Sequence, residues 1–295
     1  MVICLKFSNG NQRKFLLKVK ERLYCSWDQI AKDIGVHRQT IFAYLRESCM
    51  MSKNNFIKLC KISKLNQNKF DYKEIIVMNE EIKIKYPKLS RDLSEFIGIL
   101  AGDGHISAKE PYEVSIVAHK ILDKNLIEDY LYNLIKKLFN INPNISYQKN
   151  KVKIRSYSRK LREFLINEYH LPYGNKLGKL KIPEVIKQNP NYLKTYIRGL
   201  FDTDGSFHRH HKNTACVEIS SNDSKFLQDV KEAFNKLNFK SSVSSKNLYI
   251  YDTSEIHKFF KEIGSKNFKN IIKYERFKKE GKVPTNKEIM PIMHQ

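Results

Sequence analysis

FIGILAGDG (residues 96–104) and IRGLFDTDG (residues 197–205) decide the fold of this 295-residue chain. Each stretch combines small and bulky apolar residues at helical spacing and ends in Asp-Gly, which indicates an apolar helix that stops at the glycine. Asp103 and Asp204 occupy the matching position, 101 residues apart. The two stretches therefore predict a duplicated helix with an acid at its end.

Small residues mark one face of each predicted helix. Gly98 and Gly102 are four residues apart, as are Gly199 and Thr203, and residues at this spacing share a helix face. Such faces let two helices approach almost backbone to backbone, while the bulky residues anchor each helix in its own unit. If the faces meet, the two acids come together at one end of the pair.

Matching segments follow both stretches. Each copy continues with an alternating strand (114–116; 217–219), an amphipathic helix (126–134; 227–234), a second alternating strand (152–154; 248–250) and a short helix. Two such units in one chain predict a pseudo-two-fold pair.

The paired acids suggest a metal site. A carboxylate at a helix C-terminus opposes the helix dipole, and two adjacent carboxylates repel each other. A divalent cation offsets both costs, and hard oxygen ligands suit Mg²⁺. We expect the site to comprise Asp103, Asp204 and the residues before them, Gly102 and Thr203. Such metals activate water for in-line attack on a phosphodiester, which predicts a Mg²⁺-dependent DNA phosphodiesterase.

The two stretches and their downstream repeats resemble the LAGLIDADG homing endonucleases over residues 93–278. The resemblance implies an α+β fold in which two pseudo-symmetric αββαββα units form a β-saddle in the DNA major groove. It also implies a site-specific double-strand endonuclease that cuts a long pseudo-palindromic site as a monomer. The metal-binding acid of the motif falls on Asp103 and Asp204. The earlier acid of the motif is Ala101 in one copy and Asp202 in the other, a variation on which the metal chemistry does not depend.

The same resemblance implies polar residues where the strand after each motif ends. These are His119 and Lys120 in the first copy, and Asn222 and Asp223 in the second. Lys120 is expected to position water or stabilise charge, whereas Asp223 departs from a lysine at that position.

A catalytic lysine is also expected after each repeat, because an ammonium group neutralises charge that develops on the phosphorus centre. The segment NKLGKLKIPEVI offers Lys176, Lys179 and Lys181, and IGSKNFKNIIKYERF offers Lys266 and Lys269. We favour Lys179 and Lys266.

A basic strand predicts the DNA-facing surface, because strand side chains alternate between two faces. Val152 and Ile154 alternate with the basic residues Lys149, Lys151, Lys153 and Arg155. Arginine can read guanine, and lysines neutralise phosphates. Outside this strand, we expect DNA contacts from His119, Arg209 and Asn222. The group His208, His210 and His211 is assigned to phosphate contacts rather than zinc, since it lacks a fourth ligand.

SWDQIAKDIGVHRQTIFAYLRES (residues 26–48) predicts two short helices joined at Gly35. It resembles the helix-turn-helix of phage repressors, which implies that Arg38, Gln39 and Thr40 face a major groove. An ordinary pair of antiparallel helices needs the same glycine and apolar spacing, so that alternative stays open.

Composition sets the wider limits. The net charge of +23 (54 Lys and Arg against 31 Asp and Glu) indicates a polyanionic partner, first double-stranded DNA and second an anionic membrane, although AT-rich coding also enriches lysine. No apolar run approaches the length of a membrane span, and no targeting segment is evident. Five cysteines without a Cys-x-x-Cys pair argue against disulfides and zinc. We expect a soluble protein of the cytoplasm without a small-molecule substrate.

These observations predict five regions. They are a small all-α helix-turn-helix domain (1–75), a linker (76–92), the first repeat (93–185), the second repeat (186–280) and a C-terminal tail (281–295). The ends lack the residues that protein splicing needs, so we expect a free-standing or intron-encoded enzyme rather than an intein. The alternative function is a non-cleaving transcription regulator or an RNA maturase, and the presence of both acids favours the endonuclease.

Overall fold

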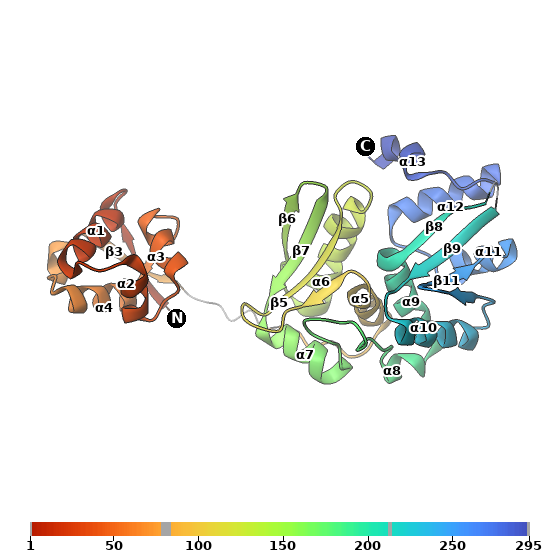
Figure 1. The fold of residues 1–295 in the computed structure, drawn as a ribbon, viewed down its shortest axis with the longest axis horizontal. Coiled ribbons are helices and arrows are strands. Elements are labelled where there is room, and N and C mark those ends of the chain that lie inside the picture. Colours follow the sequence, from red (N-terminus) through yellow and green to blue (C-terminus); the bar gives the residue numbers. More distant parts are fainter. Residues whose placement is uncertain (1, 78–83, 212–213, 294–295) are drawn as a thin grey trace. The chain divides into compact units, whose positions relative to one another are not determined.

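The computed structural model describes residues 2–77, 84–211 and 214–293. They form two compact units, Met1–Lys83 and Ile84–Gln295, whose elements are labelled in Figure 1. Among the described residues, no helix has the length and apolar character that a bilayer crossing needs.

The first unit combines helices with a sheet. Its elements are β1 (Val2–Phe7), α1 (Asn11–Leu23), α2 (Trp27–Ile34), α3 (Arg38–Leu45), β2 (Met51–Ser52), α4 (Lys53–Ser63), η1 (Gln67–Lys69) and β3 (Tyr72–Val77). The strands form an antiparallel sheet in the order β2-β1-β3. The prediction of an all-α domain ending at residue 75 is therefore wrong, because strands from its two ends pair along the full length of β1.

The predicted pair of short helices is confirmed inside this unit. The Ser26 hydroxyl accepts a hydrogen bond from the Gln29 amide (3.2 Å) and caps α2. Gly35 ends α2 with a positive φ of 75°, which is the conformation that favours glycine. Ile41 and Tyr44 of α3 are buried, whereas Arg38 and Gln39 are exposed and Thr40 is partly exposed.

The second unit contains the predicted duplication. The first series is α5 (Arg91–Ala101), β4 (Gly104–Ile106), β5 (Glu113–His119), η2 (Leu126–Leu131), α6 (Tyr132–Phe139), β6 (Asn144–Gln148), β7 (Lys151–Tyr157) and α7 (Arg159–Tyr169). The second series is α9 (Pro190–Asp204), β8 (Gly205–His210), β9 (Thr214–Ser220), α10 (Ser224–Lys236), β10 (Ser242–Ser244), β11 (Asn247–Ile250) and α11 (Thr253–Glu262). The helix α8 (Glu184–Lys187) lies between them, and α12 (Phe268–Glu280) and α13 (Asn286–Met293) follow.

The two sheets have equivalent topology. Their orders are β4-β5-β7-β6 and β8-β9-β11-β10, and every pairing is antiparallel. Figure 1 shows α5 and α9 side by side between the two sheets. The α+β prediction of two αββαββα units is thus confirmed.

Two predicted regions contain more structure than expected. Helix α5 begins at Arg91, inside the predicted linker, where the Ser90 hydroxyl caps it by accepting from the Leu93 amide; residues 78–83 of that linker lie outside the described residues. The predicted tail forms α13, whose Ile289 and Met293 pack against Leu122 of the first repeat.

Candidate active site

The two motif helices touch backbone to backbone, as the small residues predict. A Cβ atom at Gly98 would lie 2.1 Å from the carbonyl oxygen of Tyr196, and one at Gly199 would lie 2.2 Å from that of Glu95. Any side chain at either position would overlap the backbone of the other helix. The glycines are therefore required by the contact between α5 and α9.

The acids lie at one end of this helix pair. A Cβ at Gly102 would lie 2.1 Å from the Thr203 hydroxyl oxygen and 3.3 Å from the carboxyl carbon of Asp204. Thr203 donates its hydroxyl hydrogen bond to the carbonyl of Gly199 (3.0 Å), within its own helix. Asp103 directly follows Gly102, so both carboxylates are at the C-terminal ends of α5 and α9.

The surroundings of both carboxyl groups disfavour their ionised forms. Burial raises the pKa of Asp204 to about 7, and the negative charge of Asp103 acts in the same direction. Asp103 remains accessible to solvent, but partial burial of its carboxyl group raises its pKa, as does the charge of Asp123. The pair therefore carries repulsion that a nearby cation would relieve.

Lys176 supplies positive charge at this point. Its ammonium donates hydrogen bonds to the carbonyls of Leu100 (3.3 Å), Ala101 (3.0 Å) and Gly102, which are free acceptors at the end of α5. Burial lowers the pKa of Lys176, while the charges of Asp204 and Asp103 oppose this effect. The favoured Lys179 is exposed and is absent from the lining of the cleft at Asp204. The structure therefore places Lys176, rather than Lys179, at the end of α5 near the acids.

An open cleft of about 680 Å³ adjoins Asp204 and Lys176. Asn222 and Asp223, predicted from the end of β9, line this cleft together with Ser220, Ser221 and Lys246. The cleft therefore contains one of the two acids and polar groups from the second sheet.

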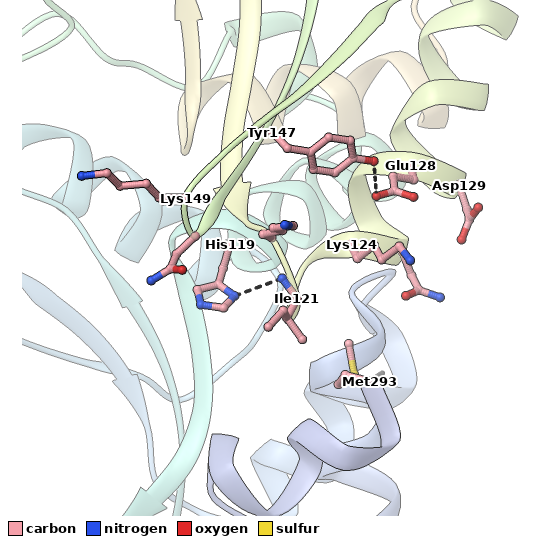
Figure 2. A pocket seen from close by; sticks show the side chains of 11 residues that line it. His119, Ile121, Lys124, Glu128, Asp129, Tyr147, Lys149 and Met293 are labelled. Atoms are coloured by element: carbon pink, nitrogen blue, oxygen red, sulfur yellow. Dashed lines mark hydrogen bonds between the residues drawn. The ribbon is translucent and has the colours of Figure 1, made fainter. Parts of the chain in front are cut away.

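The strand-end residues of the first repeat line a different cavity. The cavity has a volume of about 910 Å³, and His119, Lys120, Tyr147 and Lys149 line it. Figure 2 shows it from close by. The His119 Nδ1 atom accepts from the backbone amides of Ile121 and Leu122, both at 3.2 Å. The Lys120 ammonium lies 5.8 Å from the centre of the Tyr147 ring. Neither Asp103 nor Asp204 lines this cavity. The position of Lys120 therefore does not support its expected role of orienting water or stabilising charge beside these two acids.

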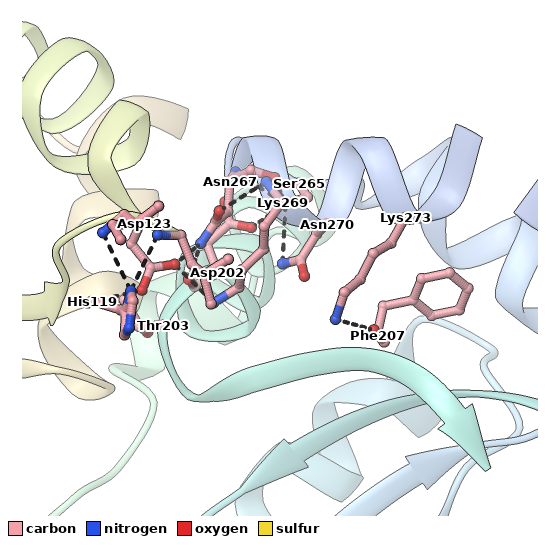
Figure 3. A network of polar contacts seen from close by, with 12 residues as sticks. His119, Asp123, Asp202, Thr203, Phe207, Ser265, Asn267, Lys269, Asn270 and Lys273 are labelled. Carbon is pink, nitrogen blue, oxygen red and sulfur yellow. Dashed lines mark hydrogen bonds and ion pairs between the residues drawn. The ribbon is translucent and has the colours of Figure 1, made fainter. Parts of the chain in front are cut away.

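A network of buried polar groups holds residues 265–269, near the end of the second repeat (Figure 3). Asp202 accepts hydrogen bonds from the Ser265 hydroxyl and the Lys266 amide (2.7 Å). The Lys266 ammonium lies 5.6 Å from the Tyr130 ring centre. The favoured Lys266 thus contributes its backbone to this network and directs its side chain to an aromatic ring.

Lys269 carries the charge that Lys266 was expected to provide. Its ammonium donates to Asp123 (2.7 Å), and its positive charge opposes the raised pKa of Asp103. Asn267 also donates to Asp123 (2.7 Å). The sequence interpretation missed Asp123, although it follows Asp103 by 20 residues as Asp223 follows Asp204 by 19.

The first sheet presents the expected basic face. Val152 and Ile154 are fully buried, while Lys151, Lys153 and Arg155 alternate with them along β7. Lys149 lies in the turn before β7, with a φ of 47°. Lys153 forms an ion pair with Glu113 of β5 (2.6 Å).

The second sheet presents a different face. His208 lies 3.4 Å from Glu218, and His210 packs against Tyr251 with ring centres 4.9 Å apart. The expected DNA contact of Arg209 gains no support from its position, because its guanidinium donates to the Val283 carbonyl (3.0 Å). It shares the inward face of β8 with buried Phe207, because strand side chains alternate. Phe207 is apolar and two residues before Arg209, so the sequence alone could have indicated that both side chains lie on the inward face of the strand.

The donor set at the helix ends fits a divalent cation. Asp103 and Asp204 offer hard oxygen atoms whose mutual repulsion a cation would relieve. Within the described ranges, no three His, Cys, Asp or Glu side chains group closely enough to hold a metal, so water and substrate oxygens would complete the coordination. Gly102 was expected at the metal site, and its carbonyl oxygen already accepts a hydrogen bond from Lys176.

Comparison with known families identifies the second repeat. Residues 191–264, from α9 to α11, match the family described as LAGLIDADG-like domain. The resemblance identified in the sequence is therefore confirmed, and the match lies in the second repeat.

Similar solved structures include two protein–DNA complexes and one LAGLIDADG domain. The homing endonuclease I-WcaI bound to its DNA recognition sequence is 14% identical, over 60% of this chain and 83% of that one, with a TM-score of 0.45. I-DmoI in complex with DNA and Ca is 17% identical, over 59% and 88%, with a TM-score of 0.44. The N-terminal LAGLIDADG domain of WhiA is 19% identical, over 63% and 92%, with a TM-score of 0.41.

Similar curated proteins differ in kind. An uncharacterized protein of Methanocaldococcus jannaschii is 25% identical over 223 residues, which are 74% of this chain and 67% of that protein. Glutamine–fructose-6-phosphate aminotransferase of the same organism is 26% identical over 65% of this chain, and the chain spans only 17% of that protein's length. The NrdEB subunit alpha of ribonucleoside-diphosphate reductase from Bacillus subtilis is 27% identical over 53% of this chain and 15% of that protein.

Proposed function

We propose that this protein is a site-specific DNA endonuclease that hydrolyses phosphodiester bonds at the Asp103–Asp204 pair with the help of Mg²⁺. The observation that carries the proposal is the approach of two carboxylates at the ends of tightly packed helices, with the pKa of Asp204 raised to about 7 by burial and by Asp103. Two carboxylates that repel each other and are partly buried destabilise the fold, so a structural role alone does not explain why they lie together.

The chain's own groups have distinct roles in this proposal. Asp103 and Asp204 would hold the divalent cation, which when bound supplies Lewis acidity and an activated water. Lys176 is held by three carbonyls of α5 and directs its positive charge toward the two acids, where it would stabilise charge that develops on the phosphate.

The basic face of the first sheet supports DNA binding. Lys151, Lys153 and Arg155 project from one face of β7, so they can contact phosphates and base edges along one groove. Both repeats lie in one chain and can each engage half of a site, which favours action as a monomer. In the first unit, exposed Arg38 and Gln39 on α3 would add contacts outside the central site.

A second function is a DNA-binding regulator that does not cut. Its support is the contact between Lys176 and the carbonyl of Gly102, because a fixed ammonium beside two carboxylates can replace a metal ion as their neutralising charge. Such a protein would bind DNA with equal affinity in the presence and absence of Mg²⁺.

Cleavage of a randomised DNA library separates the two functions. The wild type is expected to enrich a cut site with Mg²⁺, while Asp103→Asn and Asp204→Asn should bind the same site and leave it uncut. An exposed acid remote from the pair, Glu280→Gln, is the matched control and should cut normally. Binding without any cleavage by the wild type would favour the regulator.

The contribution of the first unit is tested with Arg38→Ala and Gln39→Ala on the site recovered from that library. We expect each substitution to weaken binding by about 1 kcal/mol without changing the cleavage rate of bound DNA. Unchanged affinity and unchanged site preference would assign the first unit another role.

A further inference from the structure

Two buried acids outside the proposed metal site occupy equivalent positions in the repeats. Asp123 lies just after β5 and is 8% exposed, and Asp223 lies just after β9 and is 6% exposed. Burial of a carboxylate is costly unless hydrogen bonds compensate it. The partners of each acid therefore indicate why it is there.

Asp123 reaches from the first repeat to the segment that ends the second. One carboxylate oxygen accepts from the Asn267 side-chain amide and from the Lys269 ammonium, both at 2.7 Å. The other oxygen accepts from the backbone amide of His119 (3.0 Å). Asn267 is fully buried, so this contact is a fixed part of the interior.

Asp223 reaches in the opposite direction. One of its oxygens accepts from the backbone amide of Gly178 (2.8 Å), in the segment that ends the first repeat. The other accepts from the Phe226 amide (3.2 Å) and caps α10. Gly178 is two residues beyond Lys176, so this contact fixes the segment that carries Lys176.

The contacts of Asp123 and Asp223 each fix a segment that carries a lysine close to Asp103. Lys176 and Lys269 both exert positive charge on Asp103, although they come from segments at the ends of different repeats. A lysine side chain has many rotamers in solution, and an ion pair that is sheltered from water restricts them. The Lys269 side chain is 17% exposed and the Asp123 side chain 11%.

We propose that Asp123 and Asp223 are positioning residues that reach across the repeats, where Asp123 holds Lys269 near Asp103 and Asp223 holds Lys176 near Asp103 and Asp204. The inference rests on the proposed function and deepens it. Asp123 acts directly on the lysine side chain, whereas Asp223 acts on the backbone two residues away. Loss of Asp123 should therefore be equivalent to loss of Lys269.

A double-mutant cycle tests that equivalence. Asp123→Asn and Lys269→Met should each slow single-turnover cleavage by about tenfold to a hundredfold, as loss of partners that orient metal-site groups does, with DNA affinity unchanged. The double variant should be no slower than the slower single variant. Additive losses would overturn the proposal, since they would mean that the two residues act separately.

Chemical labelling of lysines gives a readout that does not need cleavage. Reductive methylation of the full chain, followed by mass spectrometry, should modify Lys269 more slowly than exposed Lys266 in the wild type. In Asp123→Asn the Lys269 rate should rise to that of Lys266, while the Lys266 rate stays constant. An unchanged Lys269 rate in a variant with a normal melting transition would overturn the proposal.

Asp223→Ser is the second variant, because serine retains the helix cap and is too short to keep both contacts. It should raise the labelling rate of Lys176 and leave that of Lys269 unchanged; no change at Lys176 would remove Asp223 from the proposal. A wild type that never cuts DNA would overturn the endonuclease, and the labelling rates would then decide the positioning proposal alone.

Discussion

The two sheets share a topology and differ in the chemistry of their outer faces. On the first, Lys151, Lys153 and Arg155 stand on one strand. On the second, the equivalent strand β11 has Tyr249, which lies opposite Glu218 of β9, and Glu218 lies 3.4 Å from His208. One face is cationic, and the other is aromatic and close to neutral.

This difference shows which positions of the two repeats must stay alike. The helix pair must keep Gly98 and Gly199, because each meets the backbone of the other helix. Outward-facing strand residues carry no such packing constraint, so they are free to diverge. The symmetry therefore belongs to the core, while the outer faces of the two sheets have diverged.

The largest effect is expected from substitutions that disrupt the symmetric contact between α5 and α9. Gly98→Ala and Gly199→Ala place Cβ atoms 2.1 and 2.2 Å from carbonyl oxygens of the facing helix, and backbone cannot move aside cheaply. We expect each variant to lose about 3 kcal/mol of unfolding free energy in urea titrations. The exposed substitution Lys236→Ala should change it by less than about 0.5 kcal/mol. A large loss at only one glycine would show that the helices are not equivalent.

The second prediction sharpens the contrast between the faces. The triple variant Lys151→Gln, Lys153→Gln, Arg155→Gln should reduce the slope of log affinity against log salt by about 3. Each removed cation leaves one DNA phosphate without its protein partner, so binding releases fewer counterions from the DNA. The matched triple on the second sheet, His208→Gln, Tyr249→Phe, Tyr251→Phe, should leave the slope at pH 8 unchanged. Equal changes in both triples would refute the difference in charge.

A smaller effect concerns the two acids themselves. The pKa of Asp204 rises from an ordinary 3.8 to about 7 in the fold, so the folded state binds its proton more tightly. This acid therefore lowers stability as pH rises from about 4 to about 7. Asp204→Asn should melt about 3 °C above the wild type at pH 8, and much closer to it at pH 5. A lower melting temperature than the wild type at pH 8 would contradict the repulsion between the acids.

Local spacing was enough to predict the helix pair, the duplicated topology and the alternation along β7. Those features follow from residues close in sequence. The pairing of β1 with β3 was missed because the strands come from opposite ends of the first unit. Side chains alternate between the two faces of β8, so Arg209 lies on the same face as buried Phe207. The expected DNA contact of Arg209 did not take this alternation into account.

The lysines were harder to predict because loops carry them. Lys176 and Lys179 are three residues apart, and it is Lys176 that contacts the end of α5. The contact between Asp123 and Lys269 spans 146 residues, and no local pattern encodes it.

The central claim is that Asp103 and Asp204 together bind a divalent cation. Titration of Mn²⁺, followed by electron paramagnetic resonance of the free ion, measures this without DNA and without cleavage. We expect one site in the wild type whose affinity falls at least about tenfold, or 1.4 kcal/mol, in Asp103→Asn and equally in Asp204→Asn. Wild-type affinity in either variant would contradict the claim.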